Sequence, residues 1–184
     1  YGTGQRQPCL FICPAARVYK WEHEIGRCAP DRRVLSIVGN GPEREARRES
    51  VREQLSGGTG DGGQVLVTSY DLLKRDIRFY EDIHFRYQVI DEAQYIKNAA
   101  TQSAKAVKAI DVRTRFALTG TPVENRLSEI WSIFDYLMPG FLFASQHFKK
   151  EFENPIVRDG DEDALLRLRR HLGQFVLRTV ERAV

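Results

Sequence analysis

The chain has 184 residues, of which 42% are hydrophobic and 29% are charged, and its formal net charge is +3 at pH 7. This composition excludes an intrinsically disordered chain, and the length allows one domain of about 150 residues with a small addition. No apolar run reaches the ~20 residues that a membrane-spanning helix needs, and the small positive charge permits a nucleic-acid partner without requiring one.

Five short apolar runs are expected to form strands. Each run is continuously apolar rather than alternating, which is typical of strands that are covered on both faces. Helical patterns separate the runs, so the sequence predicts an α/β fold with a mainly parallel β-sheet flanked by helices. The runs are LFIC (10–13), VLSIV (34–38), VLVTS (65–69), YQVID (87–91) and FALT (116–119).

The segments between these runs carry helical signals. A helix is expected from Pro14, because proline suits the first helical turn and Val18 and Trp21 then share one face. Residues 41–55 carry mixed charges at helical spacing and predict a solvated helix. The glycine-rich segment 56–63 lacks the Lys-Ser/Thr ending of a phosphate-binding loop, so we interpret it as a flexible surface loop.

The character of the chain changes near residue 140. The last part has helical spacing and no strand-like run, and Asp161 is the expected N-cap of its last helix. We therefore expect a sheet domain over residues 1–140 and a small helical protrusion over residues 141–184.

The three cysteines are Cys9, Cys13 and Cys28, and they show no CxxC spacing. No histidine cluster lies near them to complete a zinc site. We expect buried thiols of a reducing compartment.

The predicted strand 87–91 ends in two carboxylates, Asp91 and Glu92. Side chains at the carboxyl end of a central parallel strand face the crevice in which α/β sheets bind ligands. One carboxylate there can hold Mg²⁺ while the metal bridges nucleotide phosphates, and a second can deprotonate an attacking water. A strand end that pairs with a neighbouring Lys or Arg explains the dipeptide equally well, and the two acids alone leave both interpretations open.

A polar turn follows the last predicted strand. Thr121 suits the N-cap of the next helix, with Pro122 at its first position and Glu124 completing a capping box. Capping does not account for Thr119 and Gly120. Two hydroxyl groups around a glycine, at a strand end beside the two acids, suit a relay that senses the nucleotide.

These stretches together resemble the Swi/Snf-type ATPases of helicase superfamily two, most closely their bacterial branch. IDEAQYIKN (90–98) and ALTGTPVENRLSEIWSIFDYLMPG (117–140) look like motifs II and III, and LFICPAARVYKWEHEI (10–25) and VLVTSYDLLKRD (65–76) are similar to motifs Ia and Ib. Residues 152–178 resemble the helical protrusion after the first lobe. The resemblance implies the first RecA-like lobe of a DNA-dependent ATPase that uses ATP and Mg²⁺.

The resemblance also implies residue roles. Asp91 and Glu92 would hold Mg²⁺, and Glu92 would activate the hydrolytic water. Residues that would couple nucleotide state to lobe movement are Gln94, Thr119, Gly120 and Thr121. Residues that would contact the DNA backbone are Thr68, Ser69 and Tyr70, and the helix start at Pro14, Ala15 and Ala16, whose N–H groups attract phosphate. For Lys97 and Asn98, a role near the site and ordinary helix-entry roles both stay open.

Three positions depart from the family pattern. Ala16 stands where the family usually has a hydroxyl residue, and Gln94 replaces a frequent histidine, so it keeps an amide but cannot titrate. Residues 178–181 replace two adjacent arginines and a lysine.

No GxGK[ST] phosphate loop occurs in the sequence, and the first residue is Tyr1 rather than Met. We therefore expect a fragment whose phosphate loop lies upstream and whose second lobe lies downstream, and which is inactive alone.

The parent would bind double-stranded DNA, move along it with ATP hydrolysis and remodel protein–DNA complexes such as transcription assemblies. We expect no membrane partner. The parent would be associated with the nucleoid in the cytoplasm of a bacterium, or located in the nucleus of a eukaryote. Two alternatives are a catalytically dead α/β module that binds DNA or protein, and a superfamily-two RNA helicase lobe. The long helix after TGTP and the protrusion-like tail argue against the RNA helicase.

Overall fold

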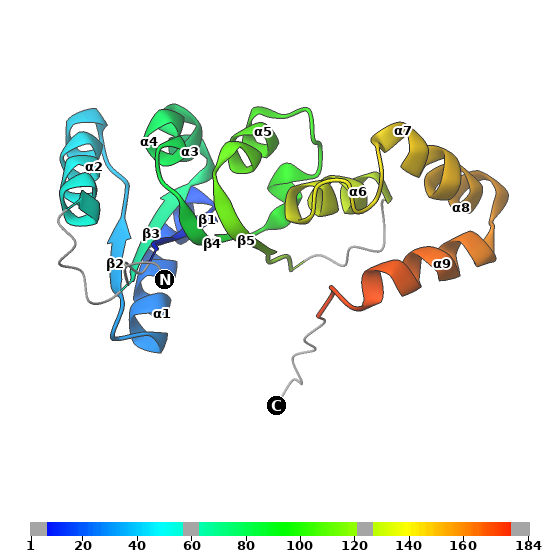
Figure 1. Cartoon of the computed structure of the whole chain (residues 1–184), viewed down its shortest axis with the longest axis horizontal. Coiled ribbons are helices and arrows are strands. Elements are labelled where there is room, and N and C mark those ends of the chain that lie inside the picture. The colour runs from blue at the N-terminus through cyan, green and yellow to red at the C-terminus, as the bar shows by residue number, and fades with distance from the viewer. Residues whose placement is uncertain (1–6, 57–62, 121–126, 178–184) are drawn as a thin grey trace, which may run out of the picture. The chain divides into compact units, whose positions relative to one another are not determined.

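The computed structural model describes residues 7–56, 63–120 and 127–177 (Figure 1). The chain divides into two compact units, Tyr1–Pro139 and Gly140–Val184. No helix in the described part of the chain has the length and apolar character to cross a membrane. The predicted glycine-rich loop, Thr121 with its capping box, and the departure at 178–181 lie at least partly outside the described residues.

Five parallel strands in the order β2-β3-β1-β4-β5 build the first unit. The strands are β1 (Cys9–Cys13), β2 (Arg33–Ser36), β3 (Gln64–Ser69), β4 (Phe85–Ile90) and β5 (Val112–Ala117). Each of the five predicted runs overlaps one of these strands, although the runs 34–38, 87–91 and 116–119 extend past the strand ends. The predicted parallel α/β fold is confirmed. Because β4 and β5 end at Ile90 and Ala117, the polar residues Asp91 and Thr119 lie just beyond the two strand ends.

Helices cover the two faces of this sheet unequally. Figure 1 shows α1 alone on one side of the sheet and α2 to α5 on the other. The helices are η1 (Ala15–Arg17), α1 (Val18–Cys28), α2 (Gly41–Ser56), α3 (Tyr70–Arg75), α4 (Ile77–Glu81), η2 (Ala93–Ile96), α5 (Gln102–Ala109) and α6 (Leu127–Leu137).

Alternation along each strand divides the buried side chains into two cores. Leu10 and Ile12 of β1 pack on the side of α3, α5 and α6, whereas Phe11 and Cys13 pack on the side of α1. The α1 side does not cover the sheet completely, since Phe116 on the edge strand β5 is 48% exposed. The expectation that both faces are covered is therefore wrong for β5.

The segment after Pro14 differs from the predicted continuous helix. Pro14 precedes the short 3-10 turn η1, and α1 begins only at Val18. Val18 and Trp21 nevertheless pack on the core as expected.

Helix α2 is fastened to the sheet unit by ion pairs. Arg44 Nε lies 2.7 Å from Asp76 Oδ2, and Arg48 pairs with the other oxygen of the same carboxylate. Arg44 also donates to the Gly39 carbonyl over 2.7 Å, and its side chain is buried. The interpretation of α2 as a solvated helix is thus wrong for this face, although its remaining charges are mostly exposed.

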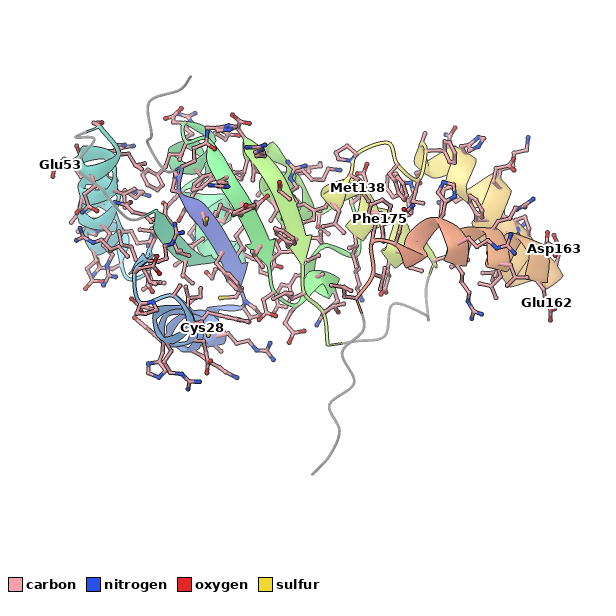
Figure 2. The ribbon with its side chains drawn as sticks, turned by 60° about the horizontal axis from the view of Figure 1, so that its bottom comes forward. Cys28, Glu53, Met138, Glu162, Asp163 and Phe175 are labelled. Atoms are coloured by element: carbon pink, nitrogen blue, oxygen red, sulfur yellow. The ribbon has the colours of Figure 1, made fainter. Side chains whose placement is uncertain are left out.

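The second unit is helical in its described residues, as predicted. Its buried side chains are Leu142, Phe148, Phe152, Ala164 and Leu168. Asp161 accepts a hydrogen bond from the Ala164 N–H over 2.9 Å, so it caps the last helix as predicted, and Glu162 and Asp163 start that helix (Figure 2). The helices are α7 (Ser145–Phe148), the π-helical turn η4 (Lys149–Glu153), α8 (Asn154–Asp159) and α9 (Glu162–Gly173).

Replacing Asp76 with Ala should destabilise the first unit strongly. The change removes the shared acceptor of Arg44 and Arg48 while both guanidinium groups stay largely buried. Breaking a buried ion pair in this way costs about 3–5 kcal/mol, which urea denaturation measures as a fall in the free energy of unfolding. The control Asp71→Ala removes an exposed pair with Lys74 and should cost no more than about 1 kcal/mol. Equal losses in the two variants would contradict the anchoring role.

Candidate functional site

Asp91 lies immediately after β4, at the carboxyl end of the sheet. Its N–H donates to the Ile12 carbonyl of β1 over 2.8 Å, and its own carbonyl accepts the Tyr70 hydroxyl over 2.8 Å. The residue is only 5% exposed. The backbone of Asp91 is therefore fixed from both sides by neighbouring elements.

Three donors satisfy the buried carboxylate of Asp91. Trp21 Nε1 and Arg17 Nη1 both donate to Oδ2, over 2.8 and 3.1 Å, and the Glu92 N–H donates to Oδ1 over 2.9 Å. The ring of Trp21 also packs on Phe11, with 4.5 Å between ring centroids. These donors replace the water that a carboxylate loses on burial.

Glu92 adopts a left-handed backbone conformation, with φ of 53°. Such a conformation is costly for a residue other than glycine, and it turns the chain sharply at the end of β4. Its Oε1 lies 2.6 Å from Arg17 Nη1, and its Oε2 accepts a hydrogen bond from Gln94 Nε2 over 2.6 Å. The turn thus brings the second acid back beside the first.

Gln94 connects the acids to the end of β5. Its Oε1 accepts the Thr119 hydroxyl over 3.2 Å, while the Ala93 N–H donates to the Leu118 carbonyl over 2.8 Å. The predicted residues Glu92, Gln94 and Thr119 therefore form a continuous chain of hydrogen bonds across two strand ends. Gly120 follows and is exposed, and Thr121 lies outside the described residues.

The side chains expected to touch DNA, at the end of β3 and the start of α3, are turned into the lobe. Thr68 donates to the Ile37 carbonyl over 3.1 Å, and the Ser69 hydroxyl caps α3 by accepting the Leu72 N–H over 3.3 Å. Tyr70 is committed to Asp91, and all three residues are buried. A direct contact of these side chains with a DNA backbone does not fit this geometry, because their hydroxyl groups are engaged inside the lobe.

The segment after β1 is more open. Ala15, Ala16 and Arg17 are exposed, and Pro14 is partly buried. Near the site, Asn98 accepts the Ala100 N–H and Lys97 lies 3.9 Å from Glu129, which are ordinary structural roles.

Sequence reasoning missed Arg17 entirely and placed Trp21 only in the buried stripe of its helix. The four-residue spacing from Arg17 to Trp21 puts both on one side of a helical segment. That spacing was visible in the sequence, but nothing in it indicated that the facing partner is Asp91.

The carboxylates of Asp91 and Glu92 are the oxygen ligands that Mg²⁺ prefers. No group of three or more His, Cys, Asp or Glu residues in the described ranges could hold a metal ion. A site with two carboxylates fits Mg²⁺ that completes its coordination with water and phosphate oxygens, so the residues present fit the ion expected from the resemblance.

Three neighbours of Asp91 have perturbed pKa values, Cys13, Tyr70 and Arg17. Burial, reinforced by the charge of Asp91, raises the pKa of the Cys13 thiol to about 12. Burial is also the main cause that raises the pKa of the Tyr70 hydroxyl. The hydrogen bond to Asp91 raises the pKa of Arg17, so its guanidinium stays charged. Arg17 is therefore the positive charge beside the two acids.

Comparison with known proteins identifies the family of this arrangement. The family model of the SNF2-related domain matches residues 2–184. The chain belongs to the SNF2-related family. The ATPase core of the SWI2/SNF2 protein of Sulfolobus solfataricus, solved in complex with double-stranded DNA, aligns with this SNF2-related chain over 94% of its length with a TM-score of 0.76 and 36% identity. The sheet is therefore a RecA-like lobe of the Snf2 type.

Two curated relatives are similar in sequence. The TATA-binding protein-associated factor MOT1 of Saccharomyces cerevisiae is 40% identical over 81% of the SNF2-related chain, and an uncharacterized ATP-dependent helicase of Mycoplasma genitalium is 34% identical over 96% of it. The chain spans only 8% and 16% of these two relatives, and 34% of the solved Sulfolobus chain.

Cys13 and Cys28 should react very differently with a thiol reagent. Cys13 is buried with its pKa raised to about 12, whereas Cys28, at the end of α1 (Figure 2), is exposed, contrary to the expectation of buried thiols. Since the thiolate is the reactive form, iodoacetamide at about pH 8 should modify Cys13 more slowly than Cys28 by ~10²-fold or more.

Peptide mass spectrometry of the folded chain measures both rates. Raising the pH to about 10 should still leave Cys13 unmodified, because that pH lies below its raised pKa. Unfolding in denaturant is the positive control and should expose Cys13. Similar rates for both cysteines in the folded chain would contradict the described environment of Asp91.

Proposed function

We propose that this SNF2-related chain is the first lobe of a DNA-dependent ATPase that moves along double-stranded DNA and remodels protein–DNA complexes. The observation that carries the proposal is the acid pair at the end of β4, joined through Gln94 to Thr119 at the end of β5. The pair supplies a hydrolytic site, and the hydrogen-bond chain supplies a route from that site to a second strand end.

Asp91 is the proposed Mg²⁺ ligand. Trp21 and the Glu92 N–H fix the orientation of its carboxylate, which reduces the cost of ordering it when a cation binds. Magnesium supplies charge neutralisation on the nucleotide phosphates when it is bound with ATP. A phosphate-binding loop and a second lobe would belong to the protein that contains this lobe.

Glu92 is the proposed general base, and it also shares in holding the cation. Its side chain is 17% exposed, so water can reach it while its backbone is held in the left-handed turn. Gln94 donates to Glu92 Oε2 and therefore senses the position of that carboxylate. Movement at Thr119 and Gly120 would then be transmitted to Glu92 through Gln94, which is the proposed coupling of hydrolysis to lobe movement, and Thr121 is proposed to share in it.

The DNA partner is supported by the relatives. The Sulfolobus ATPase core is solved with double-stranded DNA, and the MOT1 relative is named as a factor associated with TATA-binding protein. A further relative is the chromatin-remodeling ATPase INO80 of Candida albicans, 32% identical over 96% of the chain. We propose that the protein works where DNA is held, in a bacterial cytoplasm or a nucleus, on protein–DNA complexes. The second unit, residues 140–184, is proposed to be the protrusion of this lobe.

The catalytically dead binding module is the main competing function. That alternative places Asp91 and Glu92 in surface ion pairs, and Arg17 does contact both acids. Asp91, however, is nearly buried and held by three donors rather than by one exposed pair. A buried, oriented carboxylate favours the hydrolytic site.

The 184-residue chain alone should not hydrolyse ATP. Its sequence has no GxGK[ST] loop to hold the phosphates, so positioning of the γ-phosphate is lost. A steady-state assay with and without duplex DNA measures this, with buffer as the control. Turnover on the order of 1 s⁻¹ or faster, as in competent enzymes, would contradict the proposal.

Glu92→Gln, in a longer protein that contains this lobe and hydrolyses ATP, should separate binding from chemistry. The amide keeps the shape of the side chain but removes the base, so turnover should fall roughly 10²-fold or more while binding of Mg-ATP survives. A turnover assay and a nucleotide-binding titration give the two readings. Glu81→Gln, at the exposed end of α4, is the control and should change neither.

The same assay discriminates the polymer. Duplex DNA should stimulate the unsubstituted protein and RNA should not. Stimulation by RNA alone would favour an RNA helicase, and equal loss of nucleotide binding and turnover in Glu92→Gln would make Glu92 structural.

A further inference from the structure

One nitrogen of Arg17 is shared by the two acids. Arg17 Nη1 lies 3.1 Å from Asp91 Oδ2 and 2.6 Å from Glu92 Oε1. The guanidinium is thus a positive charge placed between two carboxylates from the end of β4. No other cation in the described residues is recorded against both acids.

The same position is the one that a divalent cation needs if it is to use both carboxylates. Trp21 and Arg17 together occupy Asp91 Oδ2, and the Glu92 N–H occupies one side of Oδ1. Two positive groups cannot lie within contact distance of the same pair of oxygens without strong repulsion. A bound cation that bridges the acids therefore excludes Arg17 from its present place.

The two donors to Asp91 Oδ2 differ in how easily they can leave. The side chain of Arg17 is 46% exposed and extends from the short turn η1. Trp21 is held by its packing on Phe11 and belongs to α1. Arg17 can move into water at small cost, whereas Trp21 stays in place and keeps Asp91 oriented.

We propose that Arg17 is a tethered competitor of the divalent cation at Asp91 and Glu92, and that it sets the metal affinity of the site. This inference deepens the proposed function and rests on it for the identity of the cation. Arg17 balances the charge of the two acids and occupies the cation position until a divalent ion replaces it. A residue that only held the acids in position would have the opposite effect on metal affinity, because its loss would disorder the ligands.

Direct titration of the 184-residue chain with Mn²⁺, a paramagnetic substitute for Mg²⁺, tests this without any catalytic readout. Water-proton relaxation or electron paramagnetic resonance reports the bound ion. Arg17→Gln removes the competing charge and should tighten Mn²⁺ binding about tenfold, and Arg17→Lys, which keeps the charge, should stay within about threefold of the original chain. Circular dichroism confirms that both variants are folded.

The matched control is Arg27→Gln, which removes the same charge from the exposed far end of α1, the helix that follows η1. Arg27 lies roughly 15 Å away at 1.5 Å per residue, beyond the screening length of about 10 Å, and its loss should leave Mn²⁺ affinity nearly unchanged. Trp21→Phe keeps an aromatic side chain but removes the indole N–H that orients Asp91, so it should weaken Mn²⁺ binding.

Unchanged or weaker Mn²⁺ binding in Arg17→Gln would overturn the proposal, as would equal tightening in Arg27→Gln, and so would undetectable binding in every variant. These outcomes concern metal binding to the isolated chain and leave the proposed DNA-stimulated hydrolysis untouched, because that activity is tested separately through Glu92→Gln. Unchanged turnover in Glu92→Gln would instead contradict the proposed function itself.

Discussion

The burial of one carboxylate, that of Asp91, is the constraint around which the first unit is arranged. A carboxylate that loses its water must receive hydrogen bonds from the protein, or the fold pays the full cost of desolvation. The donors come from Trp21, Arg17 and the next N–H in the chain. The backbone of the same residue is held by β1 and by Tyr70 of α3. Helices on both faces of the sheet are therefore fixed relative to one residue at the end of β4.

This constraint also explains the strained turn that follows. The Glu92 N–H can reach Asp91 Oδ1 while the Ala93 N–H reaches the Leu118 carbonyl, with the chain reversing in the left-handed conformation. The reversal returns the Glu92 carboxylate to the side of Asp91 and points Gln94 at Thr119. Backbone strain at one residue is thus offset by hydrogen bonds that join the ends of β4 and β5.

The end of β3 and the start of α3 support the acid site from the other side. The Thr68 hydroxyl donates to the Ile37 carbonyl, and the Tyr70 hydroxyl donates to the Asp91 carbonyl. The Ser69 hydroxyl caps α3 by accepting the Leu72 N–H. Tyr95 then stacks on Tyr70, with 4.8 Å between ring centroids. A segment expected to face DNA therefore acts through its side chains as internal support for the acid site, and the exposed turn at Ala15 and Ala16 is the more open of the two predicted DNA segments.

The sequence by itself determined the strands, their parallel arrangement, the acid pair and the family. Short apolar runs separated by helical segments are best buried as strands of a parallel sheet. The ends of these runs then place Asp91, Glu92 and Thr119 at strand ends. The cap at Asp161 was also predictable from the sequence, because capping is a contact between residues three apart.

Only the tertiary structure decided what surrounds the acids. Arg17 and Trp21 are separated from Asp91 by 74 and 70 residues, and no local pattern reports a partner at that distance. The same holds for Arg44, which looked like a solvated helix charge until Asp76 was placed beside it. Strand positions follow from local periodicity, whereas the partner of a charge follows from the packing of the whole sheet, because desolvation is a property of the surroundings and not of the residue.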